Sequence, residues 1–192
     1  MAKAARGLPS LSAFHGSSEA KKFVASGLEL SIISALHLPK MDVFGTCDAF
    51  CEVTWMGAEY RTGIVKNSYN AEFNDIFEFE MAEGERVSEN LYIVVKDWDR
   101  MGSNEVVGHV VVSAAILNRL IGSRTVFDGP LPVKKTVFEN AEDVEGFDGK
   151  TCALHLKISG IYPQTSRETS CTHTHTHTHT HARVCAHARM FA

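Results

Sequence analysis

The chain has 192 residues, of which 44% are hydrophobic and 22% are charged, and its formal net charge is -4. This size and composition predict one globular domain with tails, whose core needs neither disulfides nor a structural metal. The negative net charge argues against nucleic-acid binding. Five cysteines without a C-x-x-C pair indicate reduced thiols, and therefore a cytoplasmic protein.

Residues 1–26 form a lead that is rich in small residues and has no apolar periodicity, so we expect it to be disordered. Gly7 and Pro9 interrupt any apolar run, which argues against a secretory signal. The lack of acids before Glu19 leaves a transit peptide as the alternative. Ala2 excludes an N-myristoyl glycine. No stretch of the chain is apolar for long enough to predict a transmembrane helix.

Residues 27–162 carry apolar residues at every second position, the pattern of strands with one buried face. Turn sequences such as Met56-Gly57 separate these runs. We expect a β-sandwich or barrel with one short helix over 113–121, capped by Ser113. The eight predicted strands are centred on 28–32, 51–55, 61–65, 77–81, 91–95, 107–112, 125–127 and 152–158.

Residues 163–192 form a biased tail that contains the repeat CTHTHTHTHTH. Its low complexity offers no core to bury, so we expect disorder. Imidazoles bind transition metals in vitro, which leaves a metal-binding tract as the alternative to a neutral repeat expansion.

Two segments gather acidic residues between predicted strands, namely LPKMDVFGTCDAF at 38–50 and VKDWDRMGSNEVVG at 95–108. Carboxylates held together at one end of a sandwich repel one another unless a cation is bound. Calcium accepts six to eight oxygen ligands in irregular geometry, so these acids with carbonyls and water could hold about two ions. The predicted ligands are Asp42, Asp48, Asp97, Asp99 and Glu105.

These segments resemble the C2 domain family. The family's first calcium loop, D-x-x-G-x-S-D-P-Y, corresponds to residues 42–50, and its third, D-x-D-x-x-x-x-N-D-x-x-G, corresponds to residues 97–108. The pattern around the second loop corresponds to 62–66 and 70–79. The DWDR sequence is similar to the C2 domains of conventional protein kinase C, and the run 149–158 resembles the closing strand of the permuted, type II topology.

The sequence departs from the family pattern at several positions. Ala49 and Ala71 replace prolines, and Phe73 replaces a tryptophan, which are changes in packing. Glu105 replaces the last aspartate, so its carboxylate is moved by one methylene and the calcium affinity or ion count can differ.

The resemblance implies an eight-stranded antiparallel Greek-key C2 sandwich of type II topology over 27–162, which binds calcium and anionic phospholipid and is not an enzyme. It implies a cytoplasmic protein that is recruited peripherally to membranes when calcium rises, with an unidentified protein as a further potential partner. Apolar residues at loop tips are unusual, which makes them candidates for insertion into lipid, with basic residues beside them to meet phosphate. The predicted membrane-contacting residues are Val43, Phe44, Met101, Arg100 and Lys66.

Three alternatives remain open from the sequence. A calcium-independent C2 module that binds protein would share the fold, although such modules typically lack several of the loop acids. A D-x-D motif also holds metal-nucleotide complexes in transferases, but no nucleotide-binding α/β half is apparent. Phe44 could also fold back onto Trp98 or onto the edge of the sandwich and make no contact with the membrane.

Overall fold

The computed structural model describes residues 24–41, 46–82, 84–100 and 102–163. The predicted ligand Asp42, the predicted lipid contacts Val43, Phe44 and Met101, and most of both predicted tails lie outside these residues. No helical segment among these residues has the length and hydrophobicity of a membrane span.

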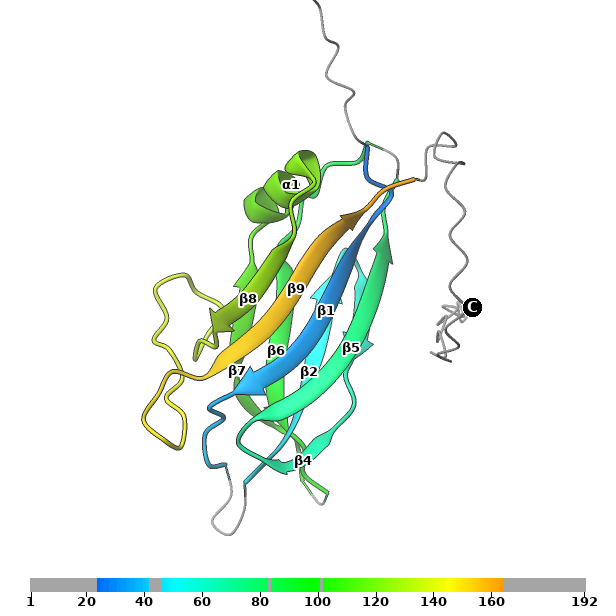
Figure 1. The fold of residues 1–192 in the computed structure, drawn as a ribbon. Coiled ribbons are helices and arrows are strands. Elements are labelled where there is room, and N and C mark those ends of the chain that lie inside the picture. The colour runs from blue at the N-terminus through cyan, green and yellow to red at the C-terminus, as the bar shows by residue number, and fades with distance from the viewer. Residues whose placement is uncertain (1–23, 42–45, 83, 101, 164–192) are drawn as a thin grey trace, which may run out of the picture.

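Two antiparallel sheets pack face to face as a sandwich (Figure 1). One sheet has the order β5-β1-β9-β8, and the other has the order β3-β2-β6-β7 with β4 paired to β2. The strands are β1 (Gly27–Leu36), β2 (Cys47–Trp55), β3 (Ala58–Arg61), β4 (Val65–Ser68), β5 (Ala71–Glu80), β6 (Leu91–Asp97), β7 (Glu105–Val112), β8 (Phe127–Pro132) and β9 (Ala153–Ile161), and the helix is α1 (Ala114–Ser123).

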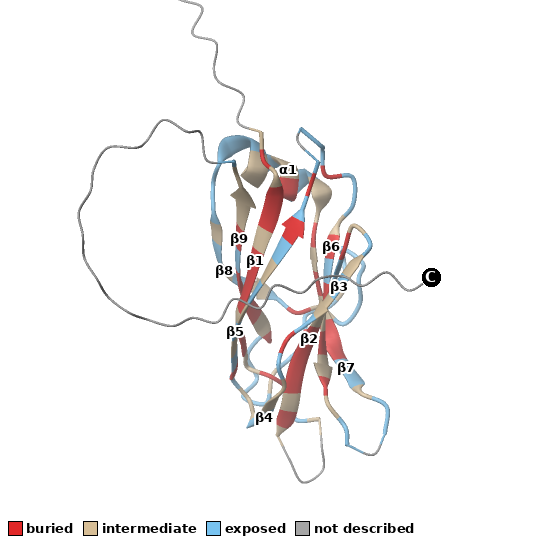
Figure 2. Ribbon diagram, turned by 90° about the vertical axis from the view of Figure 1, so that its right-hand side faces the viewer, coloured by how far each residue is buried: buried red, intermediate tan, exposed pale blue. Residues whose placement is uncertain are grey.

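The apolar residues that alternate along the sequence fill the interior between the two sheets. Along β2, Cys51, Val53 and Trp55 are buried, while Glu52 and Thr54 between them are more accessible. Figure 2 shows the buried residues concentrated on the strands of both layers. Because successive side chains of a strand point to opposite faces, a period of two is sufficient to fill one core.

The structure has nine named strands among the described residues where the sequence predicts eight. The single strand predicted over 61–65 was wrong, because β3 ends at Arg61 and β4 begins at Val65. Gly63, between them, donates its backbone N–H to the side-chain carboxylate of Asp75 at 2.9 Å, and not to a backbone carbonyl of a paired strand. The predicted turn at Met56-Gly57 is confirmed: both residues have positive φ, as a type I′ hairpin requires.

The closing strand β9 lies between β1 and β8, so the first and last strands are direct neighbours. The backbone N–H of Ser26 donates to the Ile161 carbonyl at 2.8 Å, and both lie at the end of the sandwich that also carries α1 (Figure 1). The strand β1 therefore leads directly into residues 37–41 at the opposite end, as the permuted topology implies. The predicted cap of α1 is confirmed, since the Ser113 hydroxyl accepts the Ile116 N–H at 3.4 Å.

Candidate functional site: an acidic end of one sheet

Asp48, Asp97 and Glu105 lie at one end of the sheet that contains β2, β6 and β7. Asp97 is the last residue of β6, and its register partners are Ala49 on β2 and Glu105 on β7. Asp48 directly precedes Ala49. Antiparallel pairing therefore places both predicted acidic segments at the same end of the molecule.

A direct hydrogen bond joins the two segments. The backbone N–H of Asp48 donates to Oδ1 of Asp97 at 2.7 Å, and the Asp48 carbonyl accepts the N–H of Trp98 at 2.9 Å. Asp97 is only 7% exposed, on the same face as the buried Val95. A nearly buried carboxylate needs hydrogen-bond donors or cations around it, because its charge is costly to remove from water.

Asp99 and Glu105 lie near Asp97 along the chain or across the sheet, and both are exposed. Asp99 is exposed in the loop between β6 and β7, and its backbone N–H donates to the side-chain oxygen of Asn104 at 3.2 Å. A Cβ at Gly102 would meet the Asp99 carboxylate, so a larger residue there would require that exposed side chain to move. Glu105 is exposed at the start of β7.

The ligand atoms available at this end suit a hard cation better than a soft one. Carboxylate oxygens predominate, and the buried Oγ1 of Thr46 has no hydrogen-bond partner among the described residues. Oxygen ligands of this kind fit calcium. Within the described ranges, which lack Asp42, no three His, Cys, Asp or Glu residues are close enough to hold a metal ion.

Two of the predicted lipid contacts are described, and both carry positive charge at this end. The Lys66 ammonium lies 4.8 Å from the centre of the Trp98 ring, a cation–π distance. Lys66 is exposed on β4, whose residue Ser68 pairs with Cys47. Arg100 is exposed in the loop after Asp99. Lys66 thus covers one face of the Trp98 ring. Phe44 lies outside the described residues, so its predicted alternative contact with Trp98 is not tested.

Sequence reasoning missed Asn67 and the role of Cys47. The Asn67 N–H donates to Oδ1 of Asp48 at 2.7 Å, and the backbone of Asn67 has a positive φ of 52°. Asparagine adopts this left-handed conformation more readily than most residues, which is the one signal in the sequence. Burial, reinforced by the charge of Asp97 and a hydrogen bond to it, raises the pKa of the Cys47 thiol. Cys47 therefore stays a neutral donor toward that carboxylate.

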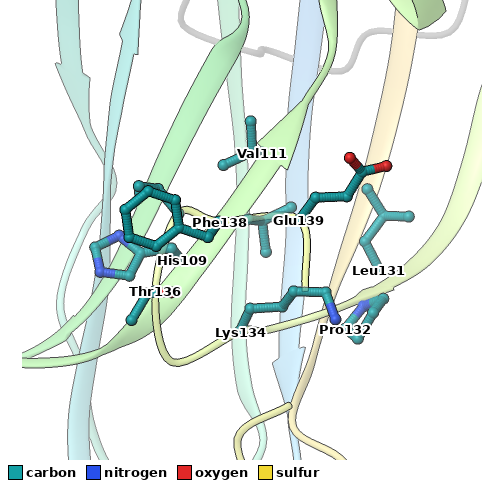
Figure 3. A pocket seen from close by; sticks show the side chains of 10 residues that line it. His109, Val111, Leu131, Pro132, Lys134, Thr136, Phe138 and Glu139 are labelled. Carbon is teal, nitrogen blue, oxygen red and sulfur yellow. The ribbon is translucent and has the colours of Figure 1, made fainter. Parts of the chain in front are cut away.

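A cavity of about 230 Å³ lies elsewhere, beside β7 and β8 (Figure 3). It is lined mainly by apolar side chains around the His109 ring, including those of Val111, Leu131, Pro132 and Phe138. None of the predicted acids lines it. Burial, together with the charge of Lys96, lowers the pKa of His109.

Comparison with known proteins extends these observations. A family model described as "C2 domain" matches residues 26–126. Human Ras GTPase-activating protein 4 is 38% identical over 88 residues, which covers 46% of this chain and 11% of that protein. Mouse synaptotagmin-5 is 34% identical over 97 residues, which covers 48% of this chain and 25% of that protein. The chain thus spans a small part of the length of either relative.

Solved structures give the same fold at low identity. The C2A domain of plant Extended Synaptotagmin 1 superposes with a TM-score of 0.58 and 16% identity, over 74% of this chain and 98% of that one. The calcium-bound C2A and C2B domains of Extended-Synaptotagmin 2 give 0.56 and 14% identity, over 73% of this chain and 47% of that one. The predicted antiparallel β-sandwich is therefore confirmed.

Proposed function

Since this chain belongs to the C2 domain family, we propose that it binds anionic phospholipid membranes in a calcium-dependent manner, through the acidic segments 38–50 and 95–108. The observation that carries this proposal is the hydrogen bond from the Asp48 N–H to the Asp97 carboxylate. It brings two acidic segments that are far apart in the sequence to one point. The proposed ligands remain Asp42, Asp48, Asp97, Asp99 and Glu105, with about two ions.

The charges at this end explain why binding would depend on calcium. Without a cation, the acids give this end a negative charge that an anionic membrane surface repels. Bound calcium would supply positive charge and open coordination positions for lipid phosphate oxygens. Lys66 and Arg100, both exposed at the same end, add attraction that acts only once the carboxylates are neutralised. Calcium and lipid affinity are then linked, each raising the other.

A solved structure of the same fold supports a cation here, since the C2A and C2B domains of Extended-Synaptotagmin 2 are calcium bound in it. The proposal contains no catalytic step. We place the protein in the cytoplasm, where it would be recruited to the membrane as calcium rises, with Val43, Phe44 and Met101 as the proposed inserting residues.

The test is sedimentation with phosphatidylserine-containing vesicles, in calcium and in chelator, for the wild type and for Asp97→Asn with Asp99→Asn. We expect calcium-dependent sedimentation of the wild type and its loss in the double variant. The matched control is Glu78→Gln with Glu80→Gln, which removes two charges from exposed positions at the end of β5 that pairs with the start of β1, away from the acidic end. That control should sediment as the wild type does.

Other outcomes point elsewhere. Equal sedimentation of the wild type in calcium and in chelator would exclude the calcium switch. No sedimentation in either condition would favour the calcium-independent module that binds protein. Equal losses in both double variants would mean that net charge, and not the acidic end, controls binding.

A further inference from the structure

A tight hairpin over residues 145–151 lies beyond the region that the family model matches. Glu145 and Thr151 form an isolated bridge, and the Gly146 N–H donates to the Lys150 carbonyl at 2.7 Å. Gly149 has a φ of 75° and donates to the Gly146 carbonyl at 3.1 Å, which closes the turn. The sequence predicted a closing strand over 149–158 but no hairpin before it.

This hairpin holds the chain at the point where β1 ends. The Leu38 N–H donates to the Tyr69 carbonyl at 2.8 Å, and the Leu38 carbonyl accepts the Phe147 N–H at 3.3 Å. The rings of Tyr69 and Phe147 stack with their centroids 3.8 Å apart and their planes 19° apart. Both backbone groups of buried Leu38 are thus fixed by segments far from it in sequence.

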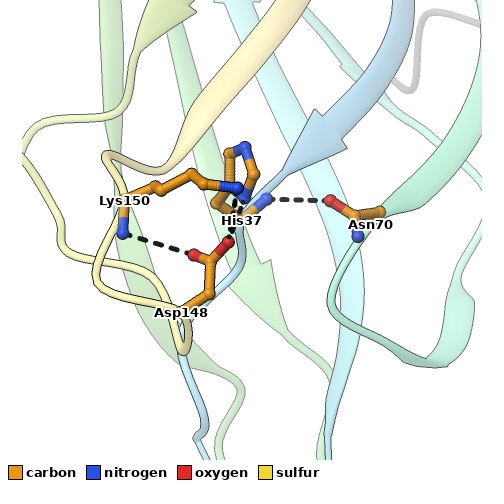
Figure 4. A network of polar contacts seen from close by, with 4 residues as sticks. All are labelled: His37, Asn70, Asp148 and Lys150. Atoms are coloured by element: carbon orange, nitrogen blue, oxygen red, sulfur yellow. Dashed lines mark hydrogen bonds and ion pairs between the residues drawn. The ribbon is translucent and has the colours of Figure 1, made fainter.

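His37 is held from the same two sides (Figure 4). Its N–H donates to Oδ1 of Asn70 at 3.0 Å, and its Nδ1 lies 2.9 Å from Oδ2 of Asp148. Lys150 lies 3.2 Å from the same carboxylate oxygen. Burial opposes ionisation of Asp148, but hydrogen bonds from Lys150 and the charge of His37 outweigh it and keep the pKa of Asp148 below its ordinary value.

Gly146 makes this close approach possible. A Cβ at that position would overlap the His37 carbonyl oxygen. Its φ is not in the left-handed region, so glycine is needed there for space and not for backbone conformation. A single methyl group at Gly146 should therefore push the hairpin away while leaving the sandwich intact.

We infer that the 145–151 hairpin is a positioning element for the first acidic segment, because it fixes His37 and Leu38 where the chain leaves β1. The inference rests on the proposed function. Residues 37–46 connect β1 to β2 without regular structure at their described ends. Binding a cation costs conformational entropy wherever it orders the backbone, and the backbone of His37 and Leu38 is already fixed by the hairpin. The hairpin should therefore strengthen cation binding without contacting the cation.

The test compares the full-length wild type with Gly146→Ala, and with Gly129→Ala as the matched control. A Cβ at Gly129 would make only an ordinary contact, at 3.9 Å from the Phe127 ring. Calcium affinity is measured by titration calorimetry, and amide hydrogen exchange of Leu38 and Phe147 is measured in chelator. We expect Gly146→Ala to exchange both amides faster and to bind calcium about tenfold more weakly, the change expected when the backbone of about one further residue must be ordered on binding.

A second pair of variants tests the same contact in case Gly146→Ala does not fold. Phe147→Leu removes the stack with Tyr69 and should weaken calcium binding, whereas Phe147→Tyr keeps the ring and should restore it. Faster exchange at Leu38 with unchanged calcium affinity would overturn the positioning role and leave the hairpin purely structural. A wild type that binds no calcium would instead overturn the proposed function, and the positioning role with it.

Discussion

The carboxylate oxygen Oδ1 of Asp48 accepts a hydrogen bond of 2.7 Å from the backbone N–H of Asn67. This contact ties the start of β2 to β4, and it needs an acceptor oxygen but not a charge. An asparagine at position 48 would keep the acceptor and lose the charge. The two contributions of Asp48, to the fold and to a cation, can therefore be separated.

We expect Asp48→Asn to fold normally in chelator and to lose most of the stabilisation that calcium gives. A ligand that binds only the folded state at 100 times its Kd stabilises by about 2.7 kcal/mol. The free energy of unfolding, measured by urea denaturation with calcium and with chelator, tests this. An equal calcium-induced gain in wild type and variant would contradict a ligand role for Asp48.

Trp98 should report membrane binding, because it lies at the acidic end beneath Lys66. The other tryptophan, Trp55, is 1% exposed and donates its indole N–H to the Glu89 carbonyl at 3.2 Å, so its emission should stay constant. We expect an emission change on adding calcium and anionic vesicles that Trp98→Phe abolishes. A change that persists in Trp98→Phe would place the membrane contact elsewhere.

Lys66→Gln should weaken vesicle binding about fivefold, since a basic residue near an anionic surface contributes about 1 kcal/mol. The matched control is Lys157→Gln, which removes an exposed lysine from β9 on the other sheet. The vesicle titration should show the difference shrinking as salt rises. Similar losses in both variants would indicate that lysine position is unimportant.

The pH dependence of stability should contain a contribution from His109. Its pKa is lowered in the folded state by burial and by Lys96. As pH falls below about 6.5, the unfolded chain gains a proton that the folded chain does not, so the free energy of unfolding falls. In His109→Gln, that free energy should change less between pH 7 and pH 5; parallel curves would contradict the predicted shift.

Thr62→Val should destabilise the fold by about 1–3 kcal/mol, although the two side chains have similar shapes. The Thr62 hydroxyl is buried, accepts the Cys51 N–H at 2.9 Å and donates to the Gly63 carbonyl at 3.0 Å. Valine would leave the Cys51 N–H without a partner. Chemical denaturation measures the loss, and Thr62→Ser, which retains the hydroxyl, should lose less than valine does.

Much of the fold could be predicted because it is local. The period of two along β2, β6 and β9 shows which side chains of each strand face the core. Ser113 marks the start of α1 because its own side chain caps the helix. The strand predicted over 61–65 was wrong because Thr62 and Gly63 bond to Cys51 and Asp75. Hydrogen bonds to side chains of distant residues produce no periodic pattern in the sequence.

The sequence by itself determined which residues could carry the chemistry, since acids at turn positions and the spacing of Asp97 and Asp99 are local features. Only the tertiary structure decided which of them meet. The bond between Asp48 and Asp97 spans 49 residues, and the hairpin at Gly146 closes on His37 from beyond the matched domain region. The physical reason is that local patterns encode burial, whereas contacts between distant segments follow from strand register, which the whole sandwich fixes together.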